Sequence, residues 1–281
     1  MLPKKLSQKQ MTLSEAIKRL EDAGVDNPAY DARELFYHIG KVEKPIFLNT
    51  VCTSQELDRA IERRAEREPL QYIIGNVGFY NEEYAVTPDC LIPRSDTEIL
   101  VDLVVKRLPK GEKMLDLCTG SGCIAISSVA NTDSTSAVAV DISEGALTIA
   151  KKNAKNNGVF ERVRFIQGDC LGTLPNDVTS DKYFCLTSNP PYIREEVYSG
   201  LEKELFHEPR IALVASDHGL QFYRALVPLG IKLVKRGGFI AFEIGFDQGE
   251  DLVKIASEHG LECEIIKDYS GNDRVALINI K

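Results

Sequence analysis

From residue 111 onward the sequence alternates short apolar runs with segments of helical periodicity. The apolar runs predict strands at 113–117, 137–140 and 164–166, with helices from Gly122 and over 144–156 between them. Right-handed β-α-β connections of this kind build a parallel sheet with helices on both faces. Ligands of such doubly wound sheets bind beyond the carboxyl ends of the strands. The pattern therefore predicts an α/β fold and the edge of the sheet where a site should lie.

The rest of the chain completes a three-part organisation. Later apolar runs predict strands at 183–188 and 239–244 and a final antiparallel hairpin of 263–266 with 275–280. Residues 12–68 instead show helical spacing between Gly and Pro breakers, and S/T-x-x-E capping boxes at Thr12, Thr53 and Ser95 mark helix starts. We therefore expect an N-terminal helical domain over 1–70, a β-hairpin linker over 71–92 and the α/β domain over 93–281.

A glycine loop, Asp116-Leu-Cys-Thr-Gly-Ser-Gly122, connects the first strand of the α/β domain to its helix. Because glycines let the backbone approach a ligand that a Cβ would obstruct, we expect a cofactor here. Asp141 ends the next strand, at the distance expected for a carboxylate that accepts from ribose hydroxyls. Asp169, after the third strand, is placed to receive an adenine amino group. The loop alone fits NAD as well as S-adenosylmethionine.

Each of these residues also has a purely structural interpretation. The glycines can serve a tight strand-to-helix turn, and Asp141 can cap the helix that follows it. Asp169 can form a turn with its own backbone. The placement of all of them at strand ends favours the cofactor site.

Asn189-Pro-Pro-Tyr192 follows the fourth predicted strand of the sheet. Prolines have no backbone N–H, so this segment leaves the sheet rigidly and exposes carbonyl oxygens. The Asn189 side-chain oxygen and the Pro190 carbonyl suit a planar group with two N–H donors, either an amide NH2 or an exocyclic base amine. Tyr192 would supply an aromatic wall for that group. The alternative is a proline-rich loop that only happens to follow a strand.

The chemistry that such a segment supports is methyl transfer to nitrogen. Two accepted hydrogen bonds favour the pyramidal form of an amide nitrogen, whose lone pair can then face a methyl sulfonium. Alignment of nitrogen, methyl and sulfur matters more than a base, because the proton leaves readily once the nitrogen is positively charged. We therefore expect none of the four histidines to act as a general base.

Composition excludes several other classes of protein. The net charge of −8 opposes an affinity that rests on many phosphates, so no direct nucleic-acid partner is expected. The seven cysteines lack metal-ligand spacing, which predicts reduced thiols and no metal site. No apolar run is long enough to span a bilayer, and the start, Met1-Leu-Pro-Lys-Lys, lacks the apolar core of a signal peptide. We expect a cytoplasmic monomer that does not bind membranes.

Together these motifs resemble those of the peptide chain release factor N5-glutamine methyltransferases, the HemK/PrmC family. The likeness spans most of the chain and rests on the order and spacing of six segments. They are Gln71 to Gly75, Leu91 to Glu98, the glycine loop, Asn189 to Ile193, Glu208 to Leu213, and Asp268 to Arg274. The resemblance implies a Rossmann-like S-adenosylmethionine-dependent methyltransferase domain preceded by a small helical bundle and a β-hairpin linker.

The resemblance also implies a reaction of translation termination, the N5-methylation of the glutamine in the Gly-Gly-Gln loop of class 1 release factors. The N-terminal domain would help to grip the release factor. Around the cofactor, the methionine part would meet Cys118, Thr119, Gly120, Ser121 and Gly122, the ribose Asp141, and the adenine Asp169 and Cys170. The substrate glutamine would be held by Asn189, Pro190, Pro191 and Tyr192, of which Asn189, Pro190 and Tyr192 are the catalytic candidates and Asn189 also borders the cofactor.

Two residues depart from the family's pattern. Cys118 stands where the loop usually begins with glycine, and Phe184 stands where an aspartate is common. We favour packing over a redox role for Cys118, because only a nearby helix N-terminus would lower its pKa. Three other functions stay open: a glutamine methyltransferase acting on a ribosomal protein, a DNA or RNA amino-group N-methyltransferase that flips out its base, and a scaffold that binds S-adenosylmethionine without turnover.

Overall fold

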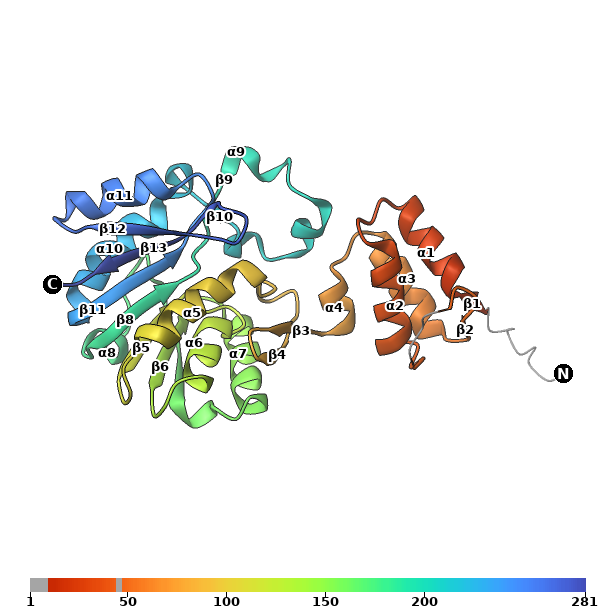
Figure 1. Cartoon of the computed structure of the whole chain (residues 1–281), viewed down its shortest axis with the longest axis horizontal. Helices are drawn as coiled ribbons and strands as arrows, with labels where there is room; N and C mark the ends of the chain where they lie inside the picture. The colour runs from red at the N-terminus through yellow and green to blue at the C-terminus, as the bar shows by residue number, and fades with distance from the viewer. Residues whose placement is uncertain (1–9, 44–46) are drawn as a thin grey trace. The chain divides into compact units, whose positions relative to one another are not determined.

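The computed structural model describes residues 10–43 and 47–281. The segment Met1 to Lys5, which was expected to lack the apolar core of a signal peptide, lies outside the described residues. The chain forms two compact units, which are drawn in Figure 1. One unit contains the chain up to Asn76 together with the short segment 202–207, and the other contains 77–201 and 208–281. No helix in the described part of the chain is long and apolar enough to cross a bilayer.

The N-terminal unit is a bundle of short helices. Its helices are α1 (Leu13–Asp22), α2 (Pro28–His38), α3 (Gln55–Ala65) and α4 (Leu70–Ile74), and the strands β1 (Met11–Thr12) and β2 (Val51–Cys52) pair antiparallel. The capping box predicted at Thr12 is confirmed. The box predicted at Thr53 is wrong by one residue, because Ser54 caps α3 and its side chain accepts from the Leu57 amide.

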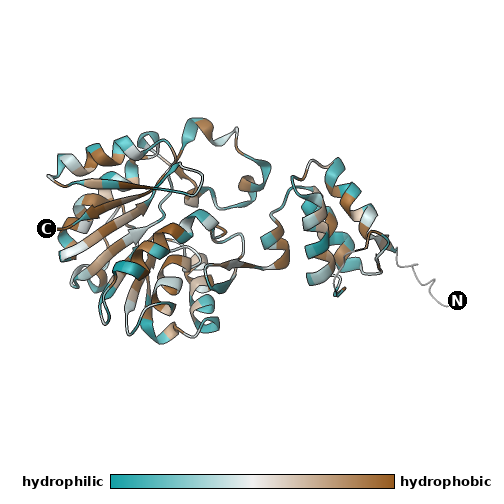
Figure 2. Ribbon diagram, in the orientation of Figure 1, coloured by the Kyte–Doolittle hydropathy of each residue, from teal (hydrophilic) through white to brown (hydrophobic). Residues whose placement is uncertain are grey.

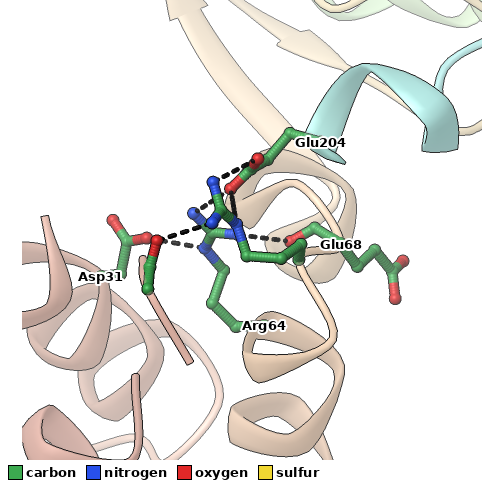
Figure 3. Close-up of polar contacts among 6 residues, drawn as sticks. Asp31, Arg64, Glu68 and Glu204 are labelled. Atoms are coloured by element: carbon green, nitrogen blue, oxygen red, sulfur yellow. Dashed lines mark hydrogen bonds and ion pairs between the residues drawn. The ribbon is translucent and has the colours of Figure 1, made fainter. Parts of the chain in front are cut away.

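A cluster of charged side chains ties the segment 202–207 into this unit. Arg64 is buried and its Nε donates to Asp31 at 2.7 Å, while its Nη2 donates to Glu204 at 3.0 Å, as Figure 3 shows. Arg67 adds a bond of 2.6 Å from its Nε to Glu204. Burial raises the pKa of Asp31, against the lowering by Arg64. Burial alone would also raise the pKa of Glu204, but the hydrogen bonds from Arg67 and Arg64 outweigh it and lower that pKa.

The connection into the second unit is partly helical. Residues 70–74 of α4 end at Gly75, which has a φ of +88°, and the hairpin itself is formed by β3 (Asn76–Phe79) and β4 (Glu82–Ala85). The hairpin is therefore shorter than the predicted segment 71–92. The capping box predicted at Ser95 is also wrong, because the Glu98 carboxylate accepts from the Tyr80 amide of the hairpin at 2.8 Å.

The second unit is built on a seven-stranded sheet with the strand order β12-β13-β11-β8-β5-β6-β7. Its strands are β5 (Lys113–Leu117), β6 (Ser136–Asp141), β7 (Val163–Gln167), β8 (Tyr183–Ser188), β11 (Val234–Glu243), β12 (Cys263–Lys267) and β13 (Asp273–Asn279). Strand β13 runs antiparallel to both of its neighbours and the other pairs are parallel. The α/β fold and the closing hairpin are thus confirmed.

Helices cover both faces of the sheet. They are α5 (Glu98–Arg107), α6 (Cys123–Ala130), α7 (Glu144–Asn156), α10 (Gln221–Leu233) and α11 (Gly249–Glu258). Strand residues alternate between two apolar clusters: Ile240 and Phe242 pack with Tyr223 of α10, whereas Phe239 and Ala241 pack with the opposite cluster. Figure 2 shows these central strands as the most hydrophobic part of the unit.

The chain order of the strands reverses between β5 and β8, which are neighbours in the sheet. The glycine loop follows β5 and the Asn-Pro-Pro-Tyr segment follows β8. The crevice at such a reversal is where α/β sheets bind ligands. The fold therefore brings the two predicted motifs to one place.

Candidate active site

A cavity of about 720 Å³ lies beyond the carboxyl ends of β5, β6, β7 and β8. Its volume falls within the range of roughly 300–1,000 Å³ that small-molecule sites occupy. Of the predicted site residues, the lining includes Cys118, Thr119, Gly120, Ser121, Asp141, Asp169, Cys170, Asn189 and Pro191. Gly122, Pro190 and Tyr192 do not belong to the lining of this cavity in the described part of the chain.

The two glycines of the loop have different roles. Gly120 has a φ of +55°, and an added Cβ would meet no atom within 4 Å, so the backbone is open toward the cavity. Gly122 has a φ of +83°, and a Cβ there would come within 2.7 Å of the Ile126 side chain. Gly122 is therefore favoured by its positive φ and by its close contact with α6, and Gly120 is the glycine that leaves room for a ligand.

Asp116, at the start of the glycine loop, is hydrogen-bonded to side chains of the loop and of a neighbouring strand. It is fully buried, and its two carboxylate oxygens accept from the hydroxyls of Thr119 at 2.6 Å and Thr187 at 2.7 Å. Burial raises the pKa of Asp116 to about 7, because hydroxyl donors compensate less than a cation would. Since Thr187 belongs to β8, this carboxyl group also ties the two motif-bearing strands together.

Asp141 lies at the end of β6 in the wall of the cavity. Its carboxylate accepts from the Gly120 amide at 2.8 Å and from the Ser143 amide at 2.9 Å. Ser143, not Asp141, is the N-cap of α7, so the helix-cap interpretation of Asp141 is wrong. Burial raises the pKa of Asp141 against these backbone hydrogen bonds. Each of its oxygens keeps a second lone pair that can accept from a ribose hydroxyl.

Asp169 forms the turn that was its structural interpretation, and it also lies in the wall of the cavity. Its carboxylate accepts from the Leu171 amide at 2.9 Å. The next residue, Cys170, lines the cavity as well. All seven cysteines are free thiols. The described residues contain no group of three or more potential ligands that could hold a metal ion.

Asn189 is oriented by a buried chain of hydrogen bonds. Its Nδ2 donates to the Thr97 hydroxyl at 3.4 Å, and Thr97 donates in turn to Glu243 at 2.5 Å. Because the NH2 group is directed at Thr97, the Asn189 amide oxygen is left as an acceptor. Thr97 and Glu243 are each about 1% exposed. Burial raises the pKa of Glu243, and the Thr97 bond and the charge of Arg274 oppose it only in part.

Tyr192 does not form the aromatic wall that the sequence suggested. Its hydroxyl donates to the other oxygen of Glu243 at 3.4 Å, and its ring packs against the apolar cluster under the sheet. Burial raises the pKa of Tyr192. The hydrogen bonds of this structure therefore link Tyr192 to Asn189 through Glu243 and Thr97.

Sequence reasoning also missed the role of Glu208, another buried carboxylate next to the cavity. Glu208 accepts from the Ile92 amide at 3.0 Å and forms an ion pair with Arg94. Ile92 and Arg94 line the cavity, as does Pro209, which follows Glu208. Both partners lie in segments that the family resemblance had highlighted, but no local pattern shows that they meet.

Comparisons with known proteins show which family and fold this chain resembles. A family model described as the PrmC N-terminal domain matches residues 12–75, and one described as the Methyltransferase small domain matches residues 95–217. The release factor glutamine methyltransferase of Moorella thermoacetica is 37% identical over 95% of this chain and 97% of its own length. That of Caulobacter vibrioides is 37% identical over 92% of each chain. The crystal structure of a methyltransferase from Pyrococcus furiosus has the same fold, with a TM-score of 0.52 at 19% identity over 71% of this chain and 88% of that one.

Proposed function

The chain belongs to the release factor glutamine methyltransferase family, and we propose that it methylates the N5 nitrogen of the glutamine in the Gly-Gly-Gln loop of class 1 release factors. Family membership makes it an S-adenosylmethionine-dependent protein-glutamine N-methyltransferase with a Rossmann-like fold. The identity of the substrate loop and the roles of the individual residues are the proposed part.

The cavity fits S-adenosylmethionine by its own chemistry. Gly120 leaves open space beside the loop, and Asp141 offers free lone pairs for the ribose hydroxyls. Cys118 and Ser121 border the place proposed for the methionine part, and Asp169 and Cys170 that for the adenine. When bound, the cofactor supplies a methyl group activated by a sulfonium.

The observation that carries the proposal is the orientation of Asn189 within this same cavity. Thr97 accepts from the Asn189 NH2 group, which leaves the amide oxygen to accept from an incoming nitrogen. The Pro190 carbonyl, although Pro190 does not line the cavity in this structure, is the proposed second acceptor for the N–H bonds of a glutamine amide. Bound S-adenosylmethionine would supply the methyl group to the nitrogen that these acceptors hold, and the methylated nitrogen would then lose a proton. Among the described residues that line the cavity there is no histidine, and the proposed step needs alignment more than a base.

The N-terminal unit is proposed to bind the release factor. Its described surface exposes Tyr30 and Tyr37 of α2, and also Phe47 and Leu48, which are 72% and 57% exposed. Exposed aromatic side chains are typical of surfaces that bind proteins.

The proposal is tested by methyl transfer from labelled S-adenosylmethionine to purified class 1 release factors. We expect label on the wild-type release factor and none on a version in which the Gln of the Gly-Gly-Gln loop is replaced by Ala. Parallel reactions contain ribosomal proteins and unmethylated DNA and RNA. Label on both release factors would refute the loop as the target, and label only on a ribosomal protein or nucleic acid would replace the proposed substrate.

A further inference from the structure

Two thiols from different loops meet in the cofactor cavity. Cys118 follows β5 and Cys170 follows β7, 52 residues later, yet their Sγ atoms lie 3.6 Å apart. Both residues line the cavity and are partly exposed, so a small reagent that enters the cavity reaches both. This contact has no signature in the sequence, because the two cysteines are far apart along the chain.

The two cysteines lie on either side of Asp141, the residue proposed to bind the ribose. Strand β6 lies between β5 and β7 in the sheet, and Asp141 stands at its carboxyl end. A bond from the loop after β5 to the loop after β7 therefore passes across the end of β6. The place that it crosses is the one where the ribose of the cofactor is expected.

The backbone at Cys118 adopts a conformation that is unfavourable for a residue with a side chain. Its φ of +56° lies in the left-handed region, where a residue with a Cβ is strained and glycine is preferred. Gly120, two residues on, has almost the same φ of +55° and carries no side chain. The chain thus holds a thiol in a glycine conformation at a point where that thiol touches another.

We propose that Cys118 and Cys170 form a reversible disulfide in the presence of a peroxide, and that this bond weakens the binding of S-adenosylmethionine because it draws together the loops after β5 and β7 that border the cavity. The inference rests on the proposed placement of the cofactor and not on which protein is methylated. It gives the methyltransferase a thiol-based off state at the site of cofactor binding.

The chemistry is balanced by the peroxide. One cysteine loses its proton and its thiolate attacks an oxygen of the peroxide, so that an S–O bond forms and the O–O bond breaks. The departing hydroxide takes up the lost proton and leaves as one water. The second thiol attacks the sulfenic sulfur, the S–S bond forms, the S–O bond breaks, and the thiol proton leaves with the oxygen as a second water. Two thiols are oxidised and one peroxide is reduced to two waters.

The movement required is small. A disulfide needs about 2.05 Å between its sulfurs, and the present separation is 3.6 Å. Contact with Cys170, followed by burial, raises the pKa of Cys118, so at neutral pH this thiol reacts slowly with weak oxidants. The reaction is therefore expected with millimolar peroxide or prolonged exposure.

The experiment uses the full chain and S-adenosylhomocysteine, a probe that cannot transfer a methyl group. Reduced protein is treated with hydrogen peroxide, the oxidant is removed, and affinity is measured by titration calorimetry before and after dithiothreitol. Peptide mass spectrometry identifies the linked cysteines. We expect a Cys118–Cys170 linked peptide, an affinity at least 10-fold weaker, and recovery on reduction. Bound S-adenosylhomocysteine should in turn slow formation of the linked peptide, because the coupling is reciprocal.

Variants separate this pair from the other thiols. Cys170→Ser and Cys118→Gly should each keep their own affinity after peroxide, whereas Cys263→Ser, a thiol outside the cavity, should lose affinity as the wild type does. The inference is overturned if the linked peptide is absent after the protein has lost affinity, if the linked protein binds the probe as before, or if Cys170→Ser stays sensitive. A reduced protein that binds the probe but labels no release factor would refute the proposed substrate and leave this test intact.

Discussion

Two carboxylates in each unit of this protein accept hydrogen bonds from different kinds of partner. In the N-terminal unit, Asp31 and Glu204 are held by the guanidinium groups of Arg64 and Arg67. In the methyltransferase unit, Asp116 and Glu243 are buried beside the cavity and accept mainly from hydroxyl groups. In the N-terminal unit the arginines oppose the cost of burying the two carboxylates, whose role is structural. Burial of Asp116 and Glu243 beside hydroxyl groups costs free energy in the folded state. These two carboxylates orient the side chains of the site.

Removing a cation from the N-terminal cluster should have the largest effect. Arg64→Met leaves Asp31 buried without its charged partner, and breaking a buried pair in this way costs about 3–5 kcal/mol. Urea unfolding of the N-terminal unit should show that loss of stability. The control is Arg63→Met, whose partner Glu68 forms a half-exposed pair, for which we expect less than about 1 kcal/mol. Equal losses in the two variants would contradict the structural role assigned to the cluster.

The next effect concerns pH and the carboxyl group of Asp116. Its pKa is about 7 in the folded protein and about 3.9 in an unfolded chain. The unfolded state therefore releases a proton that the folded state retains, so this group lowers stability as the pH rises from about 4 to about 7.

Asp116→Asn removes that titration, because the amide stays neutral and can both accept from one threonine hydroxyl and donate to the other. Relative to wild type, the variant should gain up to about 4 kcal/mol of stability between pH 4 and pH 7. Denaturant unfolding across this range measures the difference. A difference that is flat with pH would show that Asp116 is ionised in the folded protein.

Asn189→Ala tests the proposed amide clamp. We expect turnover to fall by roughly 100-fold or more, by analogy with the loss of one oriented contact in a transition state. Affinity for S-adenosylhomocysteine should persist, and Asn176→Ala, at an exposed position, is the matched control. Turnover at the wild-type rate in Asn189→Ala would remove the clamp from the mechanism.

Asp141→Asn should act on the cofactor instead. Loss of charge-assisted hydrogen bonds, at about 1.5–3 kcal/mol, predicts an affinity for S-adenosylhomocysteine that is about 10- to 100-fold weaker. Turnover at saturating cofactor should stay close to wild type. A large turnover defect with intact affinity would move Asp141 out of the cofactor role.

The smallest effect is expected at Thr97, which positions Asn189 without reaching the substrate. Thr97→Val keeps the shape and removes the hydroxyl, so kcat should fall by about 10-fold, near 1.4 kcal/mol, with the KM for release factor almost unchanged. Thr97→Ser restores the hydroxyl and should recover most of the activity. If serine and valine behave alike, the hydroxyl does not orient Asn189.

The sequence predicted those parts of the molecule that depend on neighbours along the chain. The strands at 113–117 and 183–188 and the helix at 144–156 have the expected bounds, since hydrophobic periodicity is a local signal. The glycine loop and the Asn-Pro-Pro-Tyr segment were placed at the correct edge of the sheet for the same reason.

What the sequence could not show are contacts between side chains that are distant along the chain. Glu98 was assigned to a capping box, but the hairpin supplies a competing donor, the Tyr80 amide. Tyr192 was assigned to the cavity wall, but Glu243, 51 residues later, accepts its hydroxyl instead. Phe184 replaces an expected aspartate and packs edge-on against Phe239, at 6.1 Å between ring centres. Each of these outcomes depends on which partner the fold brings near.

The six residues 202–207 make the polypeptide pass between the two units three times, at 76/77, 201/202 and 207/208. A hybrid enzyme made by joining the first 76 residues of a relative to the remainder of this chain would thus bring together a foreign bundle and the native Glu204. The relative's bundle should therefore carry the arginine partners of Glu204, or residues 202–207 should be exchanged together with the first 76 residues. Recombination of these proteins thus has to treat the two segments as one piece.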